Sequence, residues 1–521
     1  MTDFLVIFPG AELDRALFWN LNHRLITFQD SRALFREAVS RSFSPPLSAI
    51  AVSTCLQSLG YKVKLLDVAL EFGIPFNRDG IETRYEMIRQ FLVDNFPKYG
   101  IFITSLTARE HIAISRIAGI AKEIDTHVPI ILGGYHANSC KSEFLKDSNI
   151  DMVFLGDFEP YARVFAESLT KTNKPSELQQ YAPVISRNHA SINVSIHKQP
   201  SPNTQSDFDF SIVSNYLKKY DMLGMVASKG CPFSCKFCQE HAMRTYYTIL
   251  NPKKAVDIAT KILDQYRNIT GTDEIGFYFM DALFAGQPGW LTKFTSELIR
   301  RGSPLRWTFQ TRVDALRKCD FHRLKESGCY IIHVGLESFS PTTLLRMAKT
   351  RSPERYLSDF SNLVQSATKA GIDIEFNILF GIPGETKTTL EETEVGIQKT
   401  LYQYPTATVN LNLYRLFPET ESYFEAGKNK YGSRVLIPSW WEKGIIPEIT
   451  ATVQPSEDLP ATYLINFFER IYKTDAAYKR RGSFTNAQEI LDSGWLTTEH
   501  ILDMAIDKRV SFLNKLLNSS Q

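Results

Sequence analysis

Short apolar runs alternate with helical patterns along most of this 521-residue chain, and that alternation leaves few folds open. Strands that are buried on both faces of a parallel sheet read as continuous runs of β-branched residues and leucine. A helix is expected from Pro46 to Gly60, and another ends near Leu169. The pattern predicts an α/β, Rossmann-like domain over residues 1–190. Its expected strands cover residues 4–10, 62–68, 99–107, 128–136 and 151–157.

A second series of strands and helices runs from Met222 to about Pro418. Six strand–helix repeats in about 200 residues are typical of a partial TIM-type barrel, so we predict a (β/α)6 barrel over residues 221–430. In both kinds of sheet, ligands bind beyond the carboxyl ends of the parallel strands. The expected strands of this series cover residues 223–228, 276–281, 306–311, 330–338, 373–381 and 408–417.

Two further segments have weaker patterns. Serine, asparagine and proline residues cluster between the two series, so residues 191–220 are expected to be a linker. Residues 431–521 are mainly helical by pattern. They contain the pair Trp440-Trp441, for which packing in a helical core is favoured over the lining of an apolar pocket.

Composition limits the class of protein. Hydrophobic residues make up 43% and charged residues 22%, which is ordinary for globular domains. The formal net charge of +2 disfavours a dedicated nucleic-acid binder. No apolar run reaches the ~20 residues that cross a bilayer, and the first residues lack the basic start of a signal peptide. We expect a cytoplasmic protein with no membrane span and no nucleic-acid partner, whose seven cysteines are thiols or metal ligands.

Three of those cysteines lie together just after the first strand of the second series. Cys231, Cys235 and Cys238 have the spacing C-x3-C-x2-C, so one loop can wrap three thiolates around one inorganic centre. An iron–sulfur cubane normally takes four cysteines, and three would leave one iron open. A zinc knuckle with His241 or another cysteine as the fourth ligand is the alternative, although structural zinc sites usually pair C-x2-C units. Buried free thiols are expected at Cys55, Cys140, Cys319 and Cys329.

The segment CPFSCKFC resembles the signature of the radical S-adenosylmethionine (SAM) superfamily. HVGLESFS resembles that family's fourth-strand segment, and FGIPGET resembles its fifth-strand turn. Relatives often carry two adjacent acids after the second strand, whereas this chain has Asp281 followed by Ala282. Relatives also often end the sixth strand with Pro-Gly-Thr, where this chain has Pro418-Glu419-Thr420.

The resemblance implies a [4Fe-4S] cluster held by the three cysteines, with SAM chelated by the open iron. Glu337 and Ser338 are then expected near the ribose, and Arg312 near the carboxylate of SAM. Glycines at a strand end allow close approach of a ligand to the backbone. The complete set of expected SAM-binding residues is Asp281, Arg312, Glu337, Ser338, Gly381, Pro383 and Gly384. No catalytic residue is identified by the sequence.

The first domain carries no G-x-G-x-x-G or G-K-[ST] loop for a nucleotide. Its place before a radical SAM barrel resembles the cobalamin-dependent branch of the superfamily, as do the segments Pro45–Leu47 and Asp157–Glu159. Many cobalamin proteins carry Asp-x-His-x-x-Gly, but here Ala69 stands in place of the histidine. His136 is expected to be a hydrogen-bonded loop residue rather than a cobalt ligand. The residues expected at cobalamin are Ser105, Thr107, Gly133 and Gly134.

This resemblance implies a C-methyltransferase that moves a methyl group from SAM, via methylcobalamin, to an unactivated carbon. A cobalamin-dependent radical cyclase or ring-forming oxidase is the second hypothesis. In the third, the first domain is only a docking module, and a non-enzymatic iron–sulfur scaffold ranks last. The expected partners are a small-molecule or natural-product substrate and an electron donor such as flavodoxin or ferredoxin.

Overall fold

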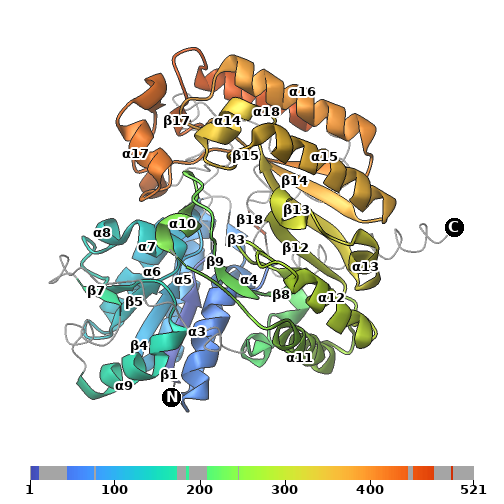
Figure 1. The fold of residues 1–521 in the computed structure, drawn as a ribbon. Helices are drawn as coiled ribbons and strands as arrows, with labels where there is room; N and C mark the ends of the chain where they lie inside the picture. Colours follow the sequence, from blue (N-terminus) through green and yellow to red (C-terminus); the bar gives the residue numbers. More distant parts are fainter. Residues whose placement is uncertain are drawn as a thin grey trace.

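The structure, a computed structural model, describes residues 2–10, 44–75, 78–172, 183–186, 208–244, 246–443, 450–474 and 495–496. A six-stranded sheet with the order β2-β1-β4-β5-β6-β7 forms the first part of the fold (Figure 1). All neighbouring strands are parallel except β7, which runs antiparallel to β6. The strands predicted in this part are confirmed. Their bounds are β1 Thr2–Phe8, β2 Val63–Asp67, β4 Pro97–Thr104, β5 Ile130–Gly133 and β6 Met152–Phe154. The sixth strand, β7 Val184–Ser186, was not predicted.

Both faces of this sheet are apolar because its strands are apolar without interruption. In β1, Phe4 and Val6 pack into one core, while Leu5 and Ile7 pack into another on the opposite face. The first core includes α3 and α9, and the second includes α5 and α6. The helices are α3 Leu47–Ser58, α4 Val68–Phe72, α5 Arg78–Asp94, α6 His111–Ile124, α7 Tyr135–Ser139, α8 Lys141–Phe144 and α9 Ala162–Thr172, with 3-10 turns η1 Ala108–Glu110 and η2 Glu159–Tyr161.

The second part is a six-stranded sheet with the sequential order β15-β14-β13-β12-β11-β8, in which every pair is parallel. All of the strands predicted here are confirmed. Helices lie along the outer side of the sheet (Figure 1). The strands are β8 Met222–Met225, β11 Gly276–Phe279, β12 Trp307–Arg312, β13 Cys329–Glu337, β14 Asp373–Phe380 and β15 Ala407–Leu413; the helices are α11 Pro252–Thr270, α12 Trp290–Arg300, α13 Phe321–Glu326, α14 Pro341–Arg346, α15 Pro353–Lys369 and α16 Lys387–Gln403.

Most of the expected linker, 191–220, lies outside the described residues, and its last part forms two 3-10 turns. The described part of 431–521 is less helical than expected, because short strand pairs accompany the one α-helix found there. Trp440 and Trp441 are buried in the core that includes α5 and α6, so the core-packing interpretation is confirmed. The remaining elements are η6 Phe210–Val213, η7 Leu217–Lys219, β9 Ser228–Gly230, α10 Gln239–Met243, β10 Tyr247–Ile249, η8 Val313–Leu316, α17 Glu421–Gly427, η9 Lys430–Gly432, β16 Arg434–Val435, η10 Trp440–Lys443, β17 Val453–Gln454, α18 Ala461–Thr474, and β18 Trp495–Leu496, which pairs with β3 Ile74–Pro75.

Among the described residues, no helix combines the length and the apolarity needed to cross a membrane.

A buried carboxyl group at the end of β2 makes stability depend on pH. Asp67 caps α4 by accepting from the Leu70 amide at 3.2 Å, and burial raises its pKa to about 7. Between about pH 4 and 7 the unfolded chain releases a proton that the folded chain keeps, so stability falls as pH rises. We expect the free energy of unfolding of the wild type, relative to Asp67→Asn, to fall by on the order of 3 kcal/mol between pH 5 and pH 8. Urea unfolding at both pH values measures this, and parallel curves for the two proteins would contradict it.

Candidate active site

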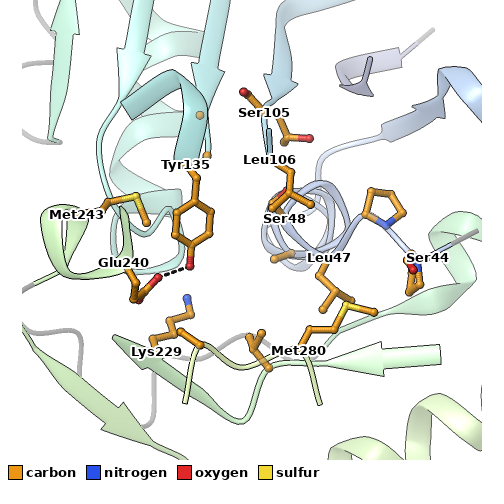
Figure 2. Close-up of a pocket in the computed structure, with 18 of the residues that line it drawn as sticks. Ser44, Leu47, Ser48, Ser105, Leu106, Tyr135, Lys229, Glu240, Met243 and Met280 are labelled. Carbon is orange, nitrogen blue, oxygen red and sulfur yellow. Dashed lines mark hydrogen bonds between the residues drawn. The ribbon is translucent and has the colours of Figure 1, made fainter. Parts of the chain in front are cut away.

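A cavity of about 680 Å³ lies between the carboxyl ends of the first sheet and the inner face of the second. Ser105 after β4 and Gly133 at the end of β5 line it from one side. Figure 2 shows Tyr135 and Leu106 directed from this edge toward Lys229 and Met280 of the second part. Because β1 lies between β2 and β4, the strand order reverses here, which is where open α/β sheets bind ligands.

The turn after β5 places bare backbone at the cavity. Gly134 has φ +99°, and a Cβ there would lie 2.1 Å from the carbonyl oxygen of Ser105. A Cβ at Gly133 would meet no atom within 4 Å, so this residue faces open space. Within the described part of the chain, the buried hydroxyl of Ser105 has no hydrogen-bond partner. Thr107, the fourth residue predicted here, does not line the cavity and instead caps η1 together with Glu110.

The three clustered cysteines lie on the loop between β9 and α10. Cys235 is buried, Cys231 and Cys238 are half-buried, and none forms a disulfide. The amide of Cys238 donates to the carbonyl of Cys235 at 3.1 Å. Burial raises the pKa of Cys231 and raises the pKa of Cys238 to about 12. The neighbouring Cys235 makes a smaller contribution in the same direction to both. Nowhere in the described residues, these cysteines included, do three His, Cys, Asp or Glu side chains form a group that could hold a metal ion.

Arg312, at the end of β12, holds this loop in place. One guanidinium nitrogen lies 3.4 Å from the sulfur of Cys235, and the group covers the ring of Phe233 at 3.7 Å. Its other N–H groups donate to Asp314 at 2.9 Å and to the carbonyl of Lys349 at 2.5 Å. Arg312 is therefore a positioning residue for the cysteine loop, and its contact with the carboxylate of SAM stays a prediction.

Three further predicted SAM-binding residues form hydrogen bonds within the chain and do not line the cavity. Asp281 accepts from the amide of Ala227 at 3.1 Å and from the hydroxyl of Ser228 at 2.5 Å. These bonds tie the end of β11 to the strand that leads into the cysteine loop. Glu337 accepts from the Lys349 ammonium at 2.8 Å, and the buried Ser338 hydroxyl bonds to a threonine of α16 at 2.8 Å.

The glycine turn after β14 is covered by the C-terminal part of the chain. A Cβ at Gly381 would lie 3.0 Å from Leu464, and one at Gly384 would lie 2.9 Å from Tyr431. The Gly384 amide donates to the carbonyl of Pro455 at 2.8 Å. Because these glycines carry no side chain, residues of the C-terminal part can pack directly against them. Pro383, between them, is buried.

A buried polar network, which the sequence did not reveal, joins the two parts of the fold beside the cavity. The hydroxyl of Tyr135 donates to Glu240, and Arg244 donates to that hydroxyl at 3.0 Å and to Glu240 at 3.1 Å (Figure 2 shows the first bond). Arg244 also donates to Asp157 at 2.9 Å, and Tyr246 donates to the same carboxylate. Tyr135 and Asp157 follow strands of the first sheet, whereas the other three flank the cysteine loop.

Lys229 completes this network from β9. Its ammonium lies 2.5 Å from Glu159 and 3.2 Å from Asp157. Burial alone would raise the pKa of Asp157, but the positive charges of Lys229 and Arg244 hold this pKa well below its ordinary range. The Asp157–Glu159 turn, noted in the sequence for its resemblance, therefore docks onto the hairpin that carries the cysteines. In the sequence, only the acidic residues of this turn were a signal, because their cationic partners lie 70 and 87 residues further along the chain.

We expect Arg244→Leu to cost about 3–5 kcal/mol of stability, because it leaves the buried Glu240 without its cation and Asp157 with Lys229 alone. The matched control is Arg267→Leu, where an exposed arginine pairs with Asp264 and Asp273. That change is expected to cost less than about 1 kcal/mol. Thermal and urea unfolding of both variants measures the difference, and equal losses would show that the network is not a stabilising contact.

His136 lies behind this turn and not in the cavity. Its Nε2 is 2.9 Å from Nδ1 of His111, and Nδ1 is 3.7 Å from the sulfur of Cys140. Burial lowers the pKa of His111 to about 4 and holds that of His136 well below its ordinary value. His136 is thus a hydrogen-bonded interior residue. Ala69, compared above with a cobalt-binding histidine, also does not line the cavity.

Residues 225–394 match the radical SAM superfamily. This stretch is a radical SAM domain. The chain is 26% identical to bacteriochlorophyllide d C-12(1)-methyltransferase of Chlorobaculum tepidum, over 44% of this chain and 47% of that protein. It is 25% identical to the anaerobic magnesium-protoporphyrin IX monomethyl ester cyclase of Cereibacter sphaeroides, over 62% of this chain and 52% of the cyclase. The chain thus spans about half the length of these two relatives.

The fold as a whole is similar to that of the radical SAM methyltransferase TsrM from Kitasatospora setae. In its complex with tryptophan and a SAM analogue, 89% of TsrM aligns with 90% of this chain, with a TM-score of 0.63 and 15% identity. Another structure of TsrM holds cobalamin and a [4Fe-4S] cluster. The likeness therefore extends beyond the radical SAM domain to the first sheet.

A radical SAM domain implies a [4Fe-4S] cluster and SAM. The three cysteines fit the cluster in residue type and in spacing along one loop, although their side chains do not form a metal-binding group in this structure. Three free thiols share one loop, and a buried guanidinium contacts the sulfur of one of them. The opposite wall of the cavity fits a large ligand rich in amides. Bare backbone at Gly133 allows close approach, and the Ser105 hydroxyl is an unused hydrogen-bonding group.

Proposed function

We propose that this chain is a cobalamin-dependent radical SAM C-methyltransferase acting on a small or natural-product substrate. The proposal is carried by one cavity whose wall includes Gly133 of the first sheet, Gly230 beside the cysteine loop and Asn377 of the second sheet. A methyl transfer that uses two cofactors needs both to face one substrate. A shared cavity meets this requirement.

We propose the domain organisation expected from the sequence: a cobalamin-binding domain at 1–190, a linker at 191–220, a partial (β/α)6 barrel at 221–430 and a covering region at 431–521. The order β2-β1-β4-β5-β6 supports the first domain, because it is a doubly wound order with a ligand site at its reversal. The sequential parallel order of the second sheet supports the barrel.

Cys231, Cys235 and Cys238 would hold three irons of the cluster, while Ser105 and Gly133 would contact cobalamin. When bound, these groups supply one-electron cleavage of SAM and transfer of a methyl group. The protein's own role is to position these groups and to enclose the cavity. Arg312 holds Cys235 at the end of β12, and the Arg244 network fixes the loop against the first sheet. A reduced flavodoxin or ferredoxin would supply electrons, and the free thiols are consistent with a cytoplasmic setting.

The test is anaerobic reconstitution with iron, sulfide and hydroxocobalamin, followed by an optical spectrum and elemental counts. One cluster and one corrinoid per chain are expected. A cluster without corrinoid would leave the first domain as a docking module, and zinc in place of iron would overturn the proposal. SAM with a deuterated methyl group is then supplied with an extract of the source cells. We expect the label in a product.

Cyclisation is the second candidate, favoured by the likeness to the magnesium-protoporphyrin cyclase. The same labelled SAM separates the two reactions, because only methyl transfer carries deuterium into the product. SAM cleavage with an unlabelled, oxidised product would favour the cyclase.

A further inference from the structure

The inner face of the second sheet carries polar side chains where barrel interiors usually carry packed valine, isoleucine and leucine. In β14, Phe376 and Ile378 are buried toward the outer helices, while Glu375 and Asn377 alternate with them and line the cavity. In β15, Asn410 and Asn412 also line the cavity. Because alternate residues of a strand face opposite sides, Glu375 and Asn377 share one face of β14, on which Leu379 is the apolar residue. Asn410 and Asn412 likewise share one face of β15.

These groups are partly paired with one another. The amide nitrogen of Asn410 donates to the amide oxygen of Asn377 at 2.8 Å. His333 Nδ1 lies 3.4 Å from a carboxylate oxygen of Glu375. On the neighbouring strand, the Tyr278 hydroxyl lies 3.3 Å from the Gln310 amide oxygen. These contacts within the wall fix the positions of its polar side chains.

The pairing leaves hydrogen-bonding capacity directed at the cavity. Within the described residues, the Asn377 amide nitrogen and the Asn410 amide oxygen have no other partner. The side chains of His333 and Glu375 are 19% and 15% exposed, and both line the cavity. A carboxylate can accept several hydrogen bonds on its two oxygens, so Glu375, although it already pairs with His333, can also accept from a molecule that lies on this wall.

We propose that this wall is the substrate site and that the substrate is a polar small molecule presenting amine or amide N–H groups to Glu375 and Asn410. This assignment rests on the proposed function and narrows its substrate class. A hydrocarbon surface laid on the wall would desolvate several polar groups at about 1–3 kcal/mol each. The same cavity is lined by Gly230, which precedes the cysteine loop, and by Gly133 at the proposed cobalamin position.

The test uses the full chain, reconstituted with cluster and cobalamin, and two pairs of probes of equal shape. Tryptamine is compared with 3-propylindole, and phenylacetamide with isobutylbenzene, with dissociation constants from ligand-observed NMR. We expect tryptamine and phenylacetamide, which carry the additional amine or amide group, to bind at least 10-fold more tightly than 3-propylindole and isobutylbenzene, respectively. Asn377→Leu combined with Asn410→Leu is expected to abolish that preference. Gln398→Leu, on the exposed side of α16, is expected to keep it.

Glu375→Gln adds a second readout, since it keeps the shape of the side chain but removes the charge. We expect Glu375→Gln to weaken the binding of tryptamine more than the binding of phenylacetamide. Three outcomes would each overturn the assignment. They are equal or tighter binding of 3-propylindole and isobutylbenzene, a preference that survives the double substitution, and no binding of any probe. Iron and corrinoid are counted on the same samples, so a protein that lacks corrinoid but keeps the preference would refute the proposed function and not this site.

Discussion

Cys235→Ala is expected to abolish cluster incorporation and to lower SAM cleavage by at least about 1,000-fold. Cys235 is the buried member of the cysteine loop, and its sulfur is the one contacted by Arg312. Without that thiolate two cysteines remain on the loop, too few for a cluster that already leaves one iron without protein ligand. Iron and sulfide analysis of the reconstituted variant, with electron paramagnetic resonance of the reduced sample, measures the outcome.

The matched control is Cys319→Ala. Cys319 is also a free, half-buried thiol, but it lies beyond β12, next to α13, and outside the cysteine loop. We expect full iron content and unchanged SAM cleavage in this variant. An unchanged iron content in Cys235→Ala would show that the loop is not the cluster site. Equal losses in both variants would point to general thiol damage.

The second large effect is expected from substitution of two adjacent glycines in the turn after β5. Gly134→Ala is expected to destabilise the fold by at least about 3 kcal/mol, because the backbone is left-handed there and the new methyl group would lie 2.1 Å from the Ser105 carbonyl oxygen. Gly133→Ala is expected to leave the free energy of unfolding almost unchanged, since nothing lies within 4 Å of its Cβ position.

Gly133→Ala should instead affect ligand binding, because its methyl group enters the cavity. We expect retention of corrinoid to fall at least 10-fold in a protein that unfolds at the wild-type temperature. Calorimetry and corrinoid counts after gel filtration separate the two effects. If Gly133→Ala retained corrinoid fully, the turn after β5 would not be part of the cobalamin site.

The sequence predicted the strands well because parallel strands are covered on both sides. The continuous run in β1 and the periodic runs of β11 to β15 have few other interpretations. The cysteine loop was recognisable because its chemistry needs residues close together in the chain. The polar alternation in β14 and β15 was also visible, but its meaning depends on which face is the inner one.

Contacts between distant segments were beyond prediction. Nothing in the sequence indicated that the guanidinium of Arg312 would contact Cys235 and Phe233, while its contact with SAM stays a prediction. Nothing local indicates that Tyr431 would lie against the turn at Gly384. The partners of Asp157 come from a hairpin far along the chain, and buried ion pairs of this kind leave no periodic signal.

The burial of Trp440 and Trp441 has a consequence for how this protein is made. Both residues belong to the same core as Leu5 and Ile7 of β1 and the apolar faces of α5 and α6. A ribosome delivers the first domain long before it delivers these tryptophans. Until then, the nascent domain exposes an apolar surface that only later residues cover, and such surfaces promote aggregation. Slow translation or a bound chaperone would therefore matter most between the emergence of α6 and that of η10, and a fragment of residues 1–190 expressed alone would carry this exposed surface permanently.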